Sequence, residues 1–249
     1  ICVNVLMMGP LPTPGIAYMT RKLGCNFGVV ISASHNLYED NGIKFFDASG
    51  AKLSDALEER IEAEMERGVL TQESNRLGRA RRGDALREDY QAFCAASVPG
   101  GLDLTGMKIV IDCANGAGYK VGPRLLADLG ADIIPIGCSP NGRNINDGCG
   151  STAPELLQLT VPGVGAAVGI ALDGDGDRLV MVDNLGRIAS SRTCSVKHRL
   201  DREKVGCIER WTGRLHAGDV RGILLARDRQ AAGQVAPAHG LCLWEVGYD

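Results

Sequence analysis

Three aspartates enclosed by two apolar runs are the feature that most constrains how this chain folds. Residues 166–172 form one apolar run and residues 178–182 a second. Asp173, Asp175 and Asp177 lie between them, separated by single glycines. Short apolar runs that border a cluster of Asp and Gly are typical of β-strands. The segment therefore predicts two strands joined by an acidic loop.

The three carboxylates predict a site for a divalent cation. Alternate side chains of an extended backbone point the same way, and the glycines let the loop curl around an ion. Carboxylates this close repel one another unless a cation neutralises them, and oxygen ligands suit Mg²⁺ better than zinc. An EF-hand is excluded, because Arg178 stands where that motif has glycine and Asn184 where it has glutamate. A polar turn between two strands is the structural alternative.

A second segment, Ile31-Ser-Ala-Ser-His-Asn36, supplies a hydroxyl group. It follows the apolar run 27–31, which predicts a buried strand, so Ser34 is expected where open α/β sheets place their ligands. A Ser-His pair in isolation more often caps a turn. Here His35 and the cation Lys44, on the next apolar run, are placed to stabilise phosphate charge or to exchange a proton. The serine and the carboxylates together indicate phosphoryl transfer.

Five segments match a known family in order and spacing: Gly9-Pro-Leu-Pro-Thr-Pro14, Ile31-Ser-Ala-Ser-His-Asn36, Asp40-Asn-Gly-Ile-Lys-Phe-Phe46, Asp112-Cys-Ala-Asn-Gly116 and Ala171-Leu-Asp-Gly-Asp-Gly-Asp-Arg178. On these residues the chain resembles the α-D-phosphohexomutases, and within them most closely the bacterial members that act on glucosamine phosphates. The resemblance covers residues 1 to about 188. It implies an α/β fold of successive mixed-sheet domains.

The resemblance also implies roles for individual residues. Ser34 would be the phosphoserine. The implied magnesium ligands are an oxygen of the Ser34 phosphate and the carboxylates of Asp173, Asp175 and Asp177. Arg178 would contact substrate phosphate beside the metal, while His35 and Lys44 would assist proton and charge movement around the serine. One departure is Leu37, where the family has proline. We expect leucine at this position to loosen the loop that carries Ser34, and so to weaken the site without abolishing its chemistry.

The implied reaction converts glucosamine 6-phosphate to glucosamine 1-phosphate through a phosphoserine and a bisphosphate intermediate. A sugar 1,6-bisphosphate would serve as activator, and the product would supply amino-sugar nucleotide and cell-wall synthesis. Phosphoryl transfer depends mainly on positioning and charge stabilisation, which Mg²⁺ with nearby Lys and Arg provides. The choice of glucosamine over glucose or mannose rests on the resemblance alone.

The pattern divides the chain into a first domain over residues 1–98, a second over 101–188 and an unassigned tail over 189–249, with Pro99-Gly-Gly101 as linker. No start signal precedes the first apolar run, so we expect the chain to begin inside the first domain. The second domain is expected to hold a βαβ unit, with strands at 107–112 and 132–136 around a helix at 122–130.

Other segments carry structural expectations. Residues 53–65 predict a helix with Ser54 as N-cap, and its stripe of Leu57, Ile61 and Met65 predicts core packing. The first eight residues predict a buried strand. A basic cluster, Arg79-Ala-Arg-Arg82, is expected to be a solvated loop. A second polar segment, Asn141-Gly-Arg-Asn-Ile-Asn-Asp-Gly148, predicts a loop to which the sequence assigns no role.

The tail has three interpretations: a small third domain, a basic partner-binding extension, or the product of a reading-frame shift. Its poor apolar periodicity favours the last. The family's third and fourth domains, which read the sugar and clamp the distal phosphate, have no counterpart in it. Nucleic acid is not an expected partner at a net charge of −3, and no apolar run reaches membrane length. Nine cysteines without a Cys-x-x-Cys pair predict free thiols in the cytoplasm.

Two classes of function remain open. The first is an enzyme, a phosphosugar mutase acting on a phosphorylated hexosamine, or a phosphoglucomutase or phosphomannomutase. The second is a catalytically defective fragment that binds Mg²⁺ or accepts phosphate on Ser34 without turning substrate over. The residues do not specify an oligomeric state.

Overall fold

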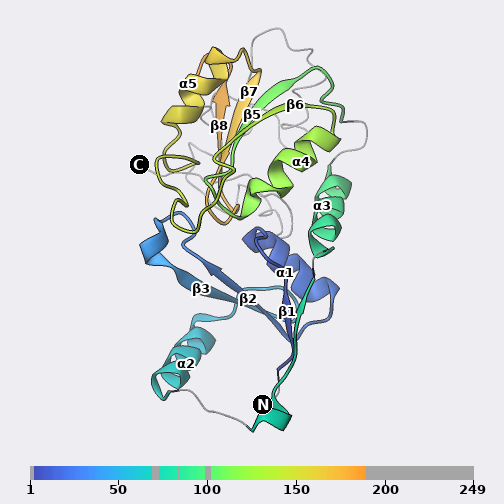
Figure 1. Ribbon diagram of the computed structural model, residues 1–249, viewed down its shortest axis with the longest axis vertical. Coiled ribbons are helices and arrows are strands. Elements are labelled where there is room, and N and C mark those ends of the chain that lie inside the picture. Colours follow the sequence, from blue (N-terminus) through green and yellow to red (C-terminus); the bar gives the residue numbers. More distant parts are fainter. Residues whose placement is uncertain (1–2, 69–72, 84, 99–101, 189–249) are drawn as a thin grey trace, which may run out of the picture.

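A computed structural model describes residues 3–68, 73–83, 85–98 and 102–188 as two α/β parts stacked along the long axis of the molecule (Figure 1). The predicted linker at 99–101 and tail at 189–249 lie outside the described residues. The strands are β1 Val5–Met7, β2 Phe27–Ser32, β3 Gly42–Asp47, β4 Ala80–Arg82, β5 Lys108–Asp112, β6 Asp132–Ile136, β7 Val168–Leu172 and β8 Leu179–Asp183. The α-helices are α1 Thr13–Lys22, α2 Asp55–Glu66, α3 Leu86–Ser97, α4 Val121–Asp128 and α5 Glu155–Gly163.

The first part is built from two small sheets around α1. Strands β2 and β3 pair antiparallel, and β1 pairs with β4 in parallel. Val30 and Phe46 share a core with Ile16 and Met19 of α1 and with Tyr90 of α3. A Cβ atom at residue 28 of β2 would collide with a Thr20 side chain of α1, so glycine there allows the helix to approach the strand closely. This packing holds the serine-bearing end of β2 in place.

Three predictions for this part were wrong, two about burial and one about secondary structure. The strand at 27–31 was expected to be buried, but its alternate residues Phe27, Val29 and Ile31 are exposed because α1 packs on the opposite face only. Strand β1 was likewise expected to be buried and is exposed along its length. The basic cluster, expected as a loop, contains β4, whose backbone pairs with β1 while its side chains stay exposed.

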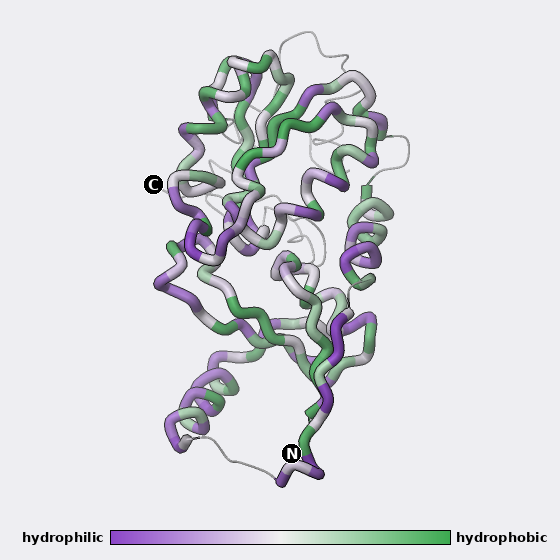
Figure 2. Tube along the Cα trace, viewed as in Figure 1, coloured by the Kyte–Doolittle hydropathy of each residue, from purple (hydrophilic) through white to green (hydrophobic). Residues whose placement is uncertain are grey.

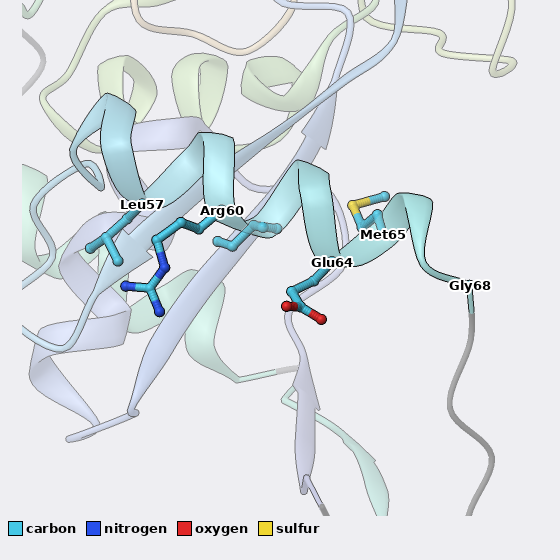
Figure 3. Close-up of a pocket in the computed structure, with 6 residues that line it drawn as sticks. Leu57, Arg60, Glu64, Met65 and Gly68 are labelled. Carbon is cyan, nitrogen blue, oxygen red and sulfur yellow. The ribbon is translucent and has the colours of Figure 1, made fainter.

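Helix α2 forms where it was predicted, but its apolar stripe is not part of the core. Leu57 is 42% exposed and Met65 61% exposed, and the helix contains no buried residue. Ser54 occupies the N-cap position without a side-chain capping bond. The stripe instead lines a pocket on the helix surface (Figure 3), together with Arg60, Glu64 and Gly68. Amphipathic spacing identifies the face of a helix suited to burial, and a packing partner decides whether burial occurs.

The second part is a four-stranded sheet in the order β6-β5-β7-β8, in which β8 alone runs antiparallel. The predicted β5–α4–β6 unit is confirmed. Val110 of β5 packs in a core with α5, whereas its neighbours Ile109 and Ile111 pack in the cores that include Leu126 of α4. The two helices therefore cover opposite faces of the sheet, and hydrophobic residues concentrate on its central strands (Figure 2). The mixed α/β fold class is confirmed.

The sheet also positions the predicted chemistry. Strands β5 and β7 run in parallel, so their carboxyl ends meet at the same edge of the sheet, on the side of the first part (Figure 1). The acidic loop leaves β7 at this edge and returns through β8.

Among the described residues, no helix is both long and apolar enough to cross a membrane.

Candidate phosphoryl-transfer and metal site

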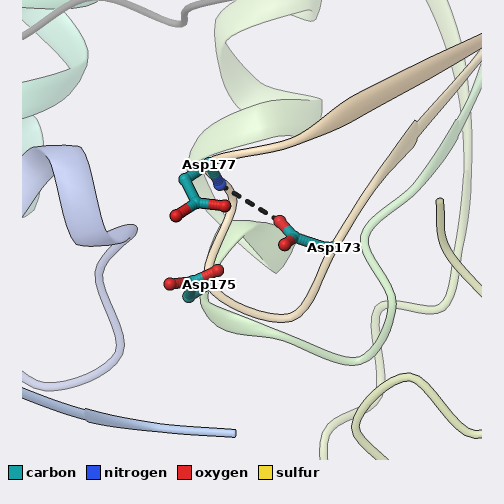
Figure 4. A group of neighbouring side chains, drawn as sticks. All are labelled: Asp173, Asp175 and Asp177. Carbon is teal, nitrogen blue, oxygen red and sulfur yellow. Dashed lines mark hydrogen bonds between the residues drawn. The ribbon is translucent and has the colours of Figure 1, made fainter. Parts of the chain in front are cut away.

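The three aspartates of the β7–β8 loop converge as the sequence predicts (Figure 4). One carboxylate oxygen from each of Asp173, Asp175 and Asp177 lies within 4.8 Å of the other two. Asp173 and Asp175 are buried, and Asp177 is at the surface. Gly176 adopts a φ of 69°, a left-handed conformation that favours glycine, so the loop can turn sharply between its ligands.

The hydrogen bonding of Asp173 fits a cation. Its Oδ1 accepts bonds from the backbone N–H groups of Asp177 and Arg178, both at 3.1 Å. Its buried Oδ2 accepts no hydrogen bond from the described part of the chain, and the Arg178 Nε atom lies 3.9 Å from it. A buried carboxylate oxygen without a donor is costly, and here it belongs to an all-oxygen group. That combination matches the preference of Mg²⁺ for a few carboxylates plus water or phosphate.

Electrostatic crowding in the loop is uneven. Burial, reinforced by the negative charges of Asp175 and Asp177, raises the pKa of Asp173 to about 7. Burial also acts to raise the pKa of Asp175, but hydrogen bonds, above all that from Lys44, hold it below the ordinary value. Asp175 therefore stays ionised near neutral pH, while Asp173 is the carboxylate that needs a cation to lose its proton readily.

Ser34 and Lys44 reach the acidic loop from the first part. The Ser34 hydroxyl donates to Asp175 Oδ1 at 3.2 Å. Lys44 Nζ lies 2.6 Å from Asp175 Oδ2, 3.3 Å from Ser34 Oγ and 3.4 Å from Asp177 Oδ2. Burial acts to lower the pKa of Lys44, but its bonds and ion pairs with the two aspartates outweigh burial and raise it. Lys44 is therefore a fixed cation here and not a base.

Two further predicted residues lie less centrally. His35 is exposed, and among the described residues it makes no hydrogen bond or ion pair, so the structure does not bring it to the serine hydroxyl. Arg178 is partly exposed and sits beside Asp173, at the border of the carboxylate group. The site as folded therefore centres on Ser34, Lys44 and the three aspartates.

Sequence reasoning assigned no role to two residues that support this centre. Thr13, at the start of α1, donates its hydroxyl to Asp175 Oδ2 at 2.8 Å and its backbone N–H to the Asp175 carbonyl at 2.9 Å. Asn146 donates from Nδ2 to the carbonyl oxygens of Ser34 and Asn36, at 2.9 and 2.7 Å. Thr13 lies in a segment matched to the family, residues 9–14, and Asn146 in the polar loop 141–148, but a contact across 162 or 112 positions leaves no local pattern.

The backbone at Leu37 is compatible with proline. Its φ is −73°, close to the angle that a proline ring fixes, and its N–H donates no hydrogen bond among the described residues. We expect Leu37→Pro to raise the free energy of unfolding by about 0.4–1 kcal/mol, because it restricts the unfolded chain without straining the folded one.

Denaturant unfolding measures this change. Leu185→Pro is the matched control: Leu185 is also exposed, but its N–H donates to Asp183 at 3.0 Å, so proline there should lower the unfolding midpoint. A midpoint for Leu37→Pro at or below that of the parent chain would contradict the prediction.

Comparison with known proteins identifies the fold. The family models for phosphoglucomutase/phosphomannomutase alpha/beta/alpha domain I and domain II match residues 2–71 and 91–186. A putative phosphomannomutase structure from Thermus thermophilus superposes with a TM-score of 0.61 at 26% identity, covering 77% of this chain and 44% of that one.

Curated relatives are more similar in sequence. The phosphoglucosamine mutase of Chromobacterium violaceum is 57% identical over 186 residues, which are 75% of this chain and 42% of that protein. The phosphoglucosamine mutase of Cupriavidus taiwanensis is 49% identical over 235 residues, 94% of this chain and 46% of that protein. The second match extends past residue 188, where we expected the resemblance to end. The chain spans less than half the length of these relatives. It belongs to the phosphoglucomutase/phosphomannomutase family, the α-D-phosphohexomutases.

Proposed function

We propose that this chain carries the phosphoserine and magnesium centre of a phosphosugar mutase that interconverts glucosamine 6-phosphate and glucosamine 1-phosphate. One observation carries the proposal: the Ser34 hydroxyl, supplied by the first part, meets Asp175 of the second part and the cation Lys44. A nucleophile, a fixed positive charge and a carboxylate cluster are the groups that phosphoryl transfer requires. The choice of glucosamine is supported by the two phosphoglucosamine mutase relatives.

The residues suggest how each transfer proceeds. When a phosphoryl group leaves Ser34, negative charge develops on Oγ, and Lys44 Nζ at 3.3 Å is placed to stabilise it. In the reverse direction the bond from Oγ to phosphorus forms while the bond from phosphorus to the sugar oxygen breaks, and the hydroxyl must lose its proton. Its hydrogen bond to Asp175 directs that proton toward Oδ1. Because Lys44 remains protonated, its part is electrostatic.

The aspartates Asp173, Asp175 and Asp177 would hold Mg²⁺, with an oxygen of the Ser34 phosphate as a further ligand. When bound, the ion would neutralise charge on the transferred phosphoryl group. Arg178 would contact substrate phosphate at the border of this site. His35, exposed beside Ser34, would act on a bound sugar phosphate rather than on the serine itself. A sugar 1,6-bisphosphate would load the serine with its first phosphoryl group.

A narrower function is the second candidate: Mg²⁺ binding and phosphate acceptance without turnover. It is supported by one observation: the hydroxyl, the cation and the carboxylates that phosphate acceptance needs all lie in the described residues. We place either activity in the cytoplasm. Five free thiols in the described residues are consistent with a reducing compartment, namely those of Cys25, Cys94, Cys113, Cys138 and Cys149.

Two measurements test the proposal. The full chain is incubated with Mg²⁺ and glucose 1,6-bisphosphate, and intact mass with peptide mapping follows the product. We expect one added phosphoryl group, located on Ser34; a chain that gains none would overturn both candidates. A coupled assay of glucosamine 1-phosphate formation from glucosamine 6-phosphate then separates them. Turnover supports the mutase, and phosphorylation without turnover supports the narrower function.

A further inference from the structure

The loop between β6 and α5 contacts the backbone of the serine loop, residues 33–37, which follows β2. Asn146, only 5% exposed, donates one amide proton to the Ser34 carbonyl at 2.9 Å and the other to the Asn36 carbonyl at 2.7 Å. Its own backbone is anchored, because its N–H donates to the Ala114 carbonyl at 2.9 Å. A single buried side chain therefore holds the backbone on both sides of His35.

The serine loop needs such support. Ser34 adopts a φ of 55°, in the left-handed region that residues other than glycine rarely occupy. Within the loop, the Ser34 N–H donates to the Ser32 hydroxyl and the Asn36 N–H to the Ala33 carbonyl, each at 2.9 Å. These bonds leave the carbonyls of Ser34 and Asn36 to Asn146. A strained conformation persists only where its surroundings hold it.

Asn146 also has a left-handed backbone and is incompletely bonded. Its φ is 57°, and its buried Oδ1 has no hydrogen-bond partner among the residues that the structure describes. The opposite amide orientation would place Oδ1 against two carbonyl oxygens, so repulsion fixes Nδ2 toward the serine loop. A residue that leaves one buried acceptor unsatisfied to bind two carbonyls costs stability. Such a cost is typical of sites where geometry matters more than stability.

The acidic loop approaches the same carbonyl. A Cβ atom at residue 174, between the first two aspartates, would lie 2.6 Å from the Ser34 carbonyl oxygen and 2.5 Å from the side chain of Ile145. Glycine at this position therefore allows the acidic loop to pack closely against both the serine loop and the loop that carries Asn146. Asn146 thus stands at the junction where the hydroxyl of the first part is brought to the carboxylates of the second.

We infer that Asn146 is a positioning residue for Ser34: its amide holds the left-handed backbone that keeps the serine hydroxyl against Asp175 and Lys44. The inference rests on the proposed phosphoryl transfer for its functional meaning. Displacing a reacting group by about 1 Å can slow a reaction by about 100-fold. Loss of this amide should therefore slow the transfer itself and leave donor binding largely unchanged.

Asn146→Ala in the full chain tests this directly. With saturating glucose 1,6-bisphosphate and Mg²⁺, we expect the rate constant for phosphorylation of Ser34 to fall about 10- to 100-fold. The donor concentration that gives half the maximal rate should stay within about threefold, because Asn146 contacts the serine loop and not the carboxylates. Asn144→Ala is the matched control: among the described residues the Asn144 side chain bonds only to the backbone of Ser139 and Asn141 in its own loop, so its removal should leave the rate within about twofold.

Hydrogen–deuterium exchange gives a readout that does not depend on activity. The Asn36 amide donates to Ala33 within the held loop, and its exchange should rise at least about tenfold in Asn146→Ala but not in Asn144→Ala. Asn146→Gly, which also removes both donors and suits the φ of 57° at this position, serves if the alanine variant does not fold, and the same changes are expected of it.

The outcomes separate the two proposals. Slower phosphorylation with faster exchange supports the role of Asn146. If the parent chain is phosphorylated and folded Asn146 variants match it in rate, or if their exchange is unchanged, the inference is overturned while the proposed function stands. If the parent chain gains no phosphate, the proposed function fails. Unchanged exchange in the variants would then overturn the holding role as well, and faster exchange would support it as a structural one.

Discussion

Replacing Ser34 with alanine should abolish phosphate incorporation from glucose 1,6-bisphosphate. Ser34 Oγ is the hydroxyl that the fold brings against both Asp175 and Lys44, and a phosphoryl group transferred to the protein needs that oxygen to form its bond. We expect the rate to fall by more than about 1,000-fold, which places it at background. Intact mass spectrometry over the time course measures the loss.

Two controls give this result its meaning. Ser54→Ala removes an exposed hydroxyl that makes no capping bond, so it should be phosphorylated at the parent rate. Mg²⁺ binding by Ser34→Ala, followed by calorimetry, should stay within about threefold of the parent value, because the three carboxylates remain. Incorporation of one phosphoryl group by Ser34→Ala, on any residue at the parent rate, would contradict the assignment of the serine.

The centre of the site was predictable from sequence because its parts lie at the ends of recognisable strands. The acidic loop joins two apolar runs, Ser34 follows β2, and Lys44 lies near the start of β3, the antiparallel partner of β2. The ends of strands lie together at the edge of a sheet, so local sequence patterns predicted that these residues, far apart in the chain, would be close in space. Residues matched to the family in register added the roles that spacing alone leaves open.

What the sequence missed depends on contacts between distant segments. Asn146 looked like one more polar residue in a loop, because the carbonyls that it binds are 110 and 112 positions away. For α2 the sequence predicted a contact that does not form: the spacing of its apolar residues is that of a buried helix face, yet Leu57 and Met65 are exposed. Local patterns report the chemistry of a face, and packing partners are decided by tertiary structure.

The second large effect should come from Asp173→Asn, which we expect to weaken Mg²⁺ binding by at least about 100-fold at pH 8. The substitution keeps the shape of the side chain and removes one negative ligand; even loss of a residue that only supports a ligand costs about 10- to 100-fold in metal affinity. Without metal at pH 8, the variant should be more stable than the parent by about 1–3 kcal/mol, because it removes a buried negative charge that Asp175 and Asp177 repel.

The pH dependence follows from the raised pKa of Asp173. The folded pKa of about 7 lies above the ordinary value of 3.8, so the folded chain without metal holds this proton below pH 7 and loses stability as pH rises from about 4 to 7. Mg²⁺ must displace the same proton below pH 7. Its affinity for the parent chain should therefore fall about tenfold for each pH unit between 7 and 5.

Calorimetric titration of the metal-free chain with Mg²⁺ at pH 8, 7 and 6 tests the predicted affinities, and denaturant unfolding without metal tests the predicted stabilities. Asp173→Asn has no proton to displace at residue 173, so its weak affinity should change much less between pH 8 and pH 6. Asp183→Asn is the matched control. Asp183 is the last residue of β8, the strand that follows the acidic loop, and it pairs with Arg187 outside the carboxylate group. The affinity of this variant for Mg²⁺ should stay within about twofold of the parent value. Equal Mg²⁺ affinity in Asp173→Asn and the parent would remove Asp173 from the ligand set. A parent affinity that does not fall below pH 7 would show instead that the Asp173 carboxylate is already ionised there, with Arg178, whose Nε lies 3.9 Å from it, in place of metal as its counter-charge.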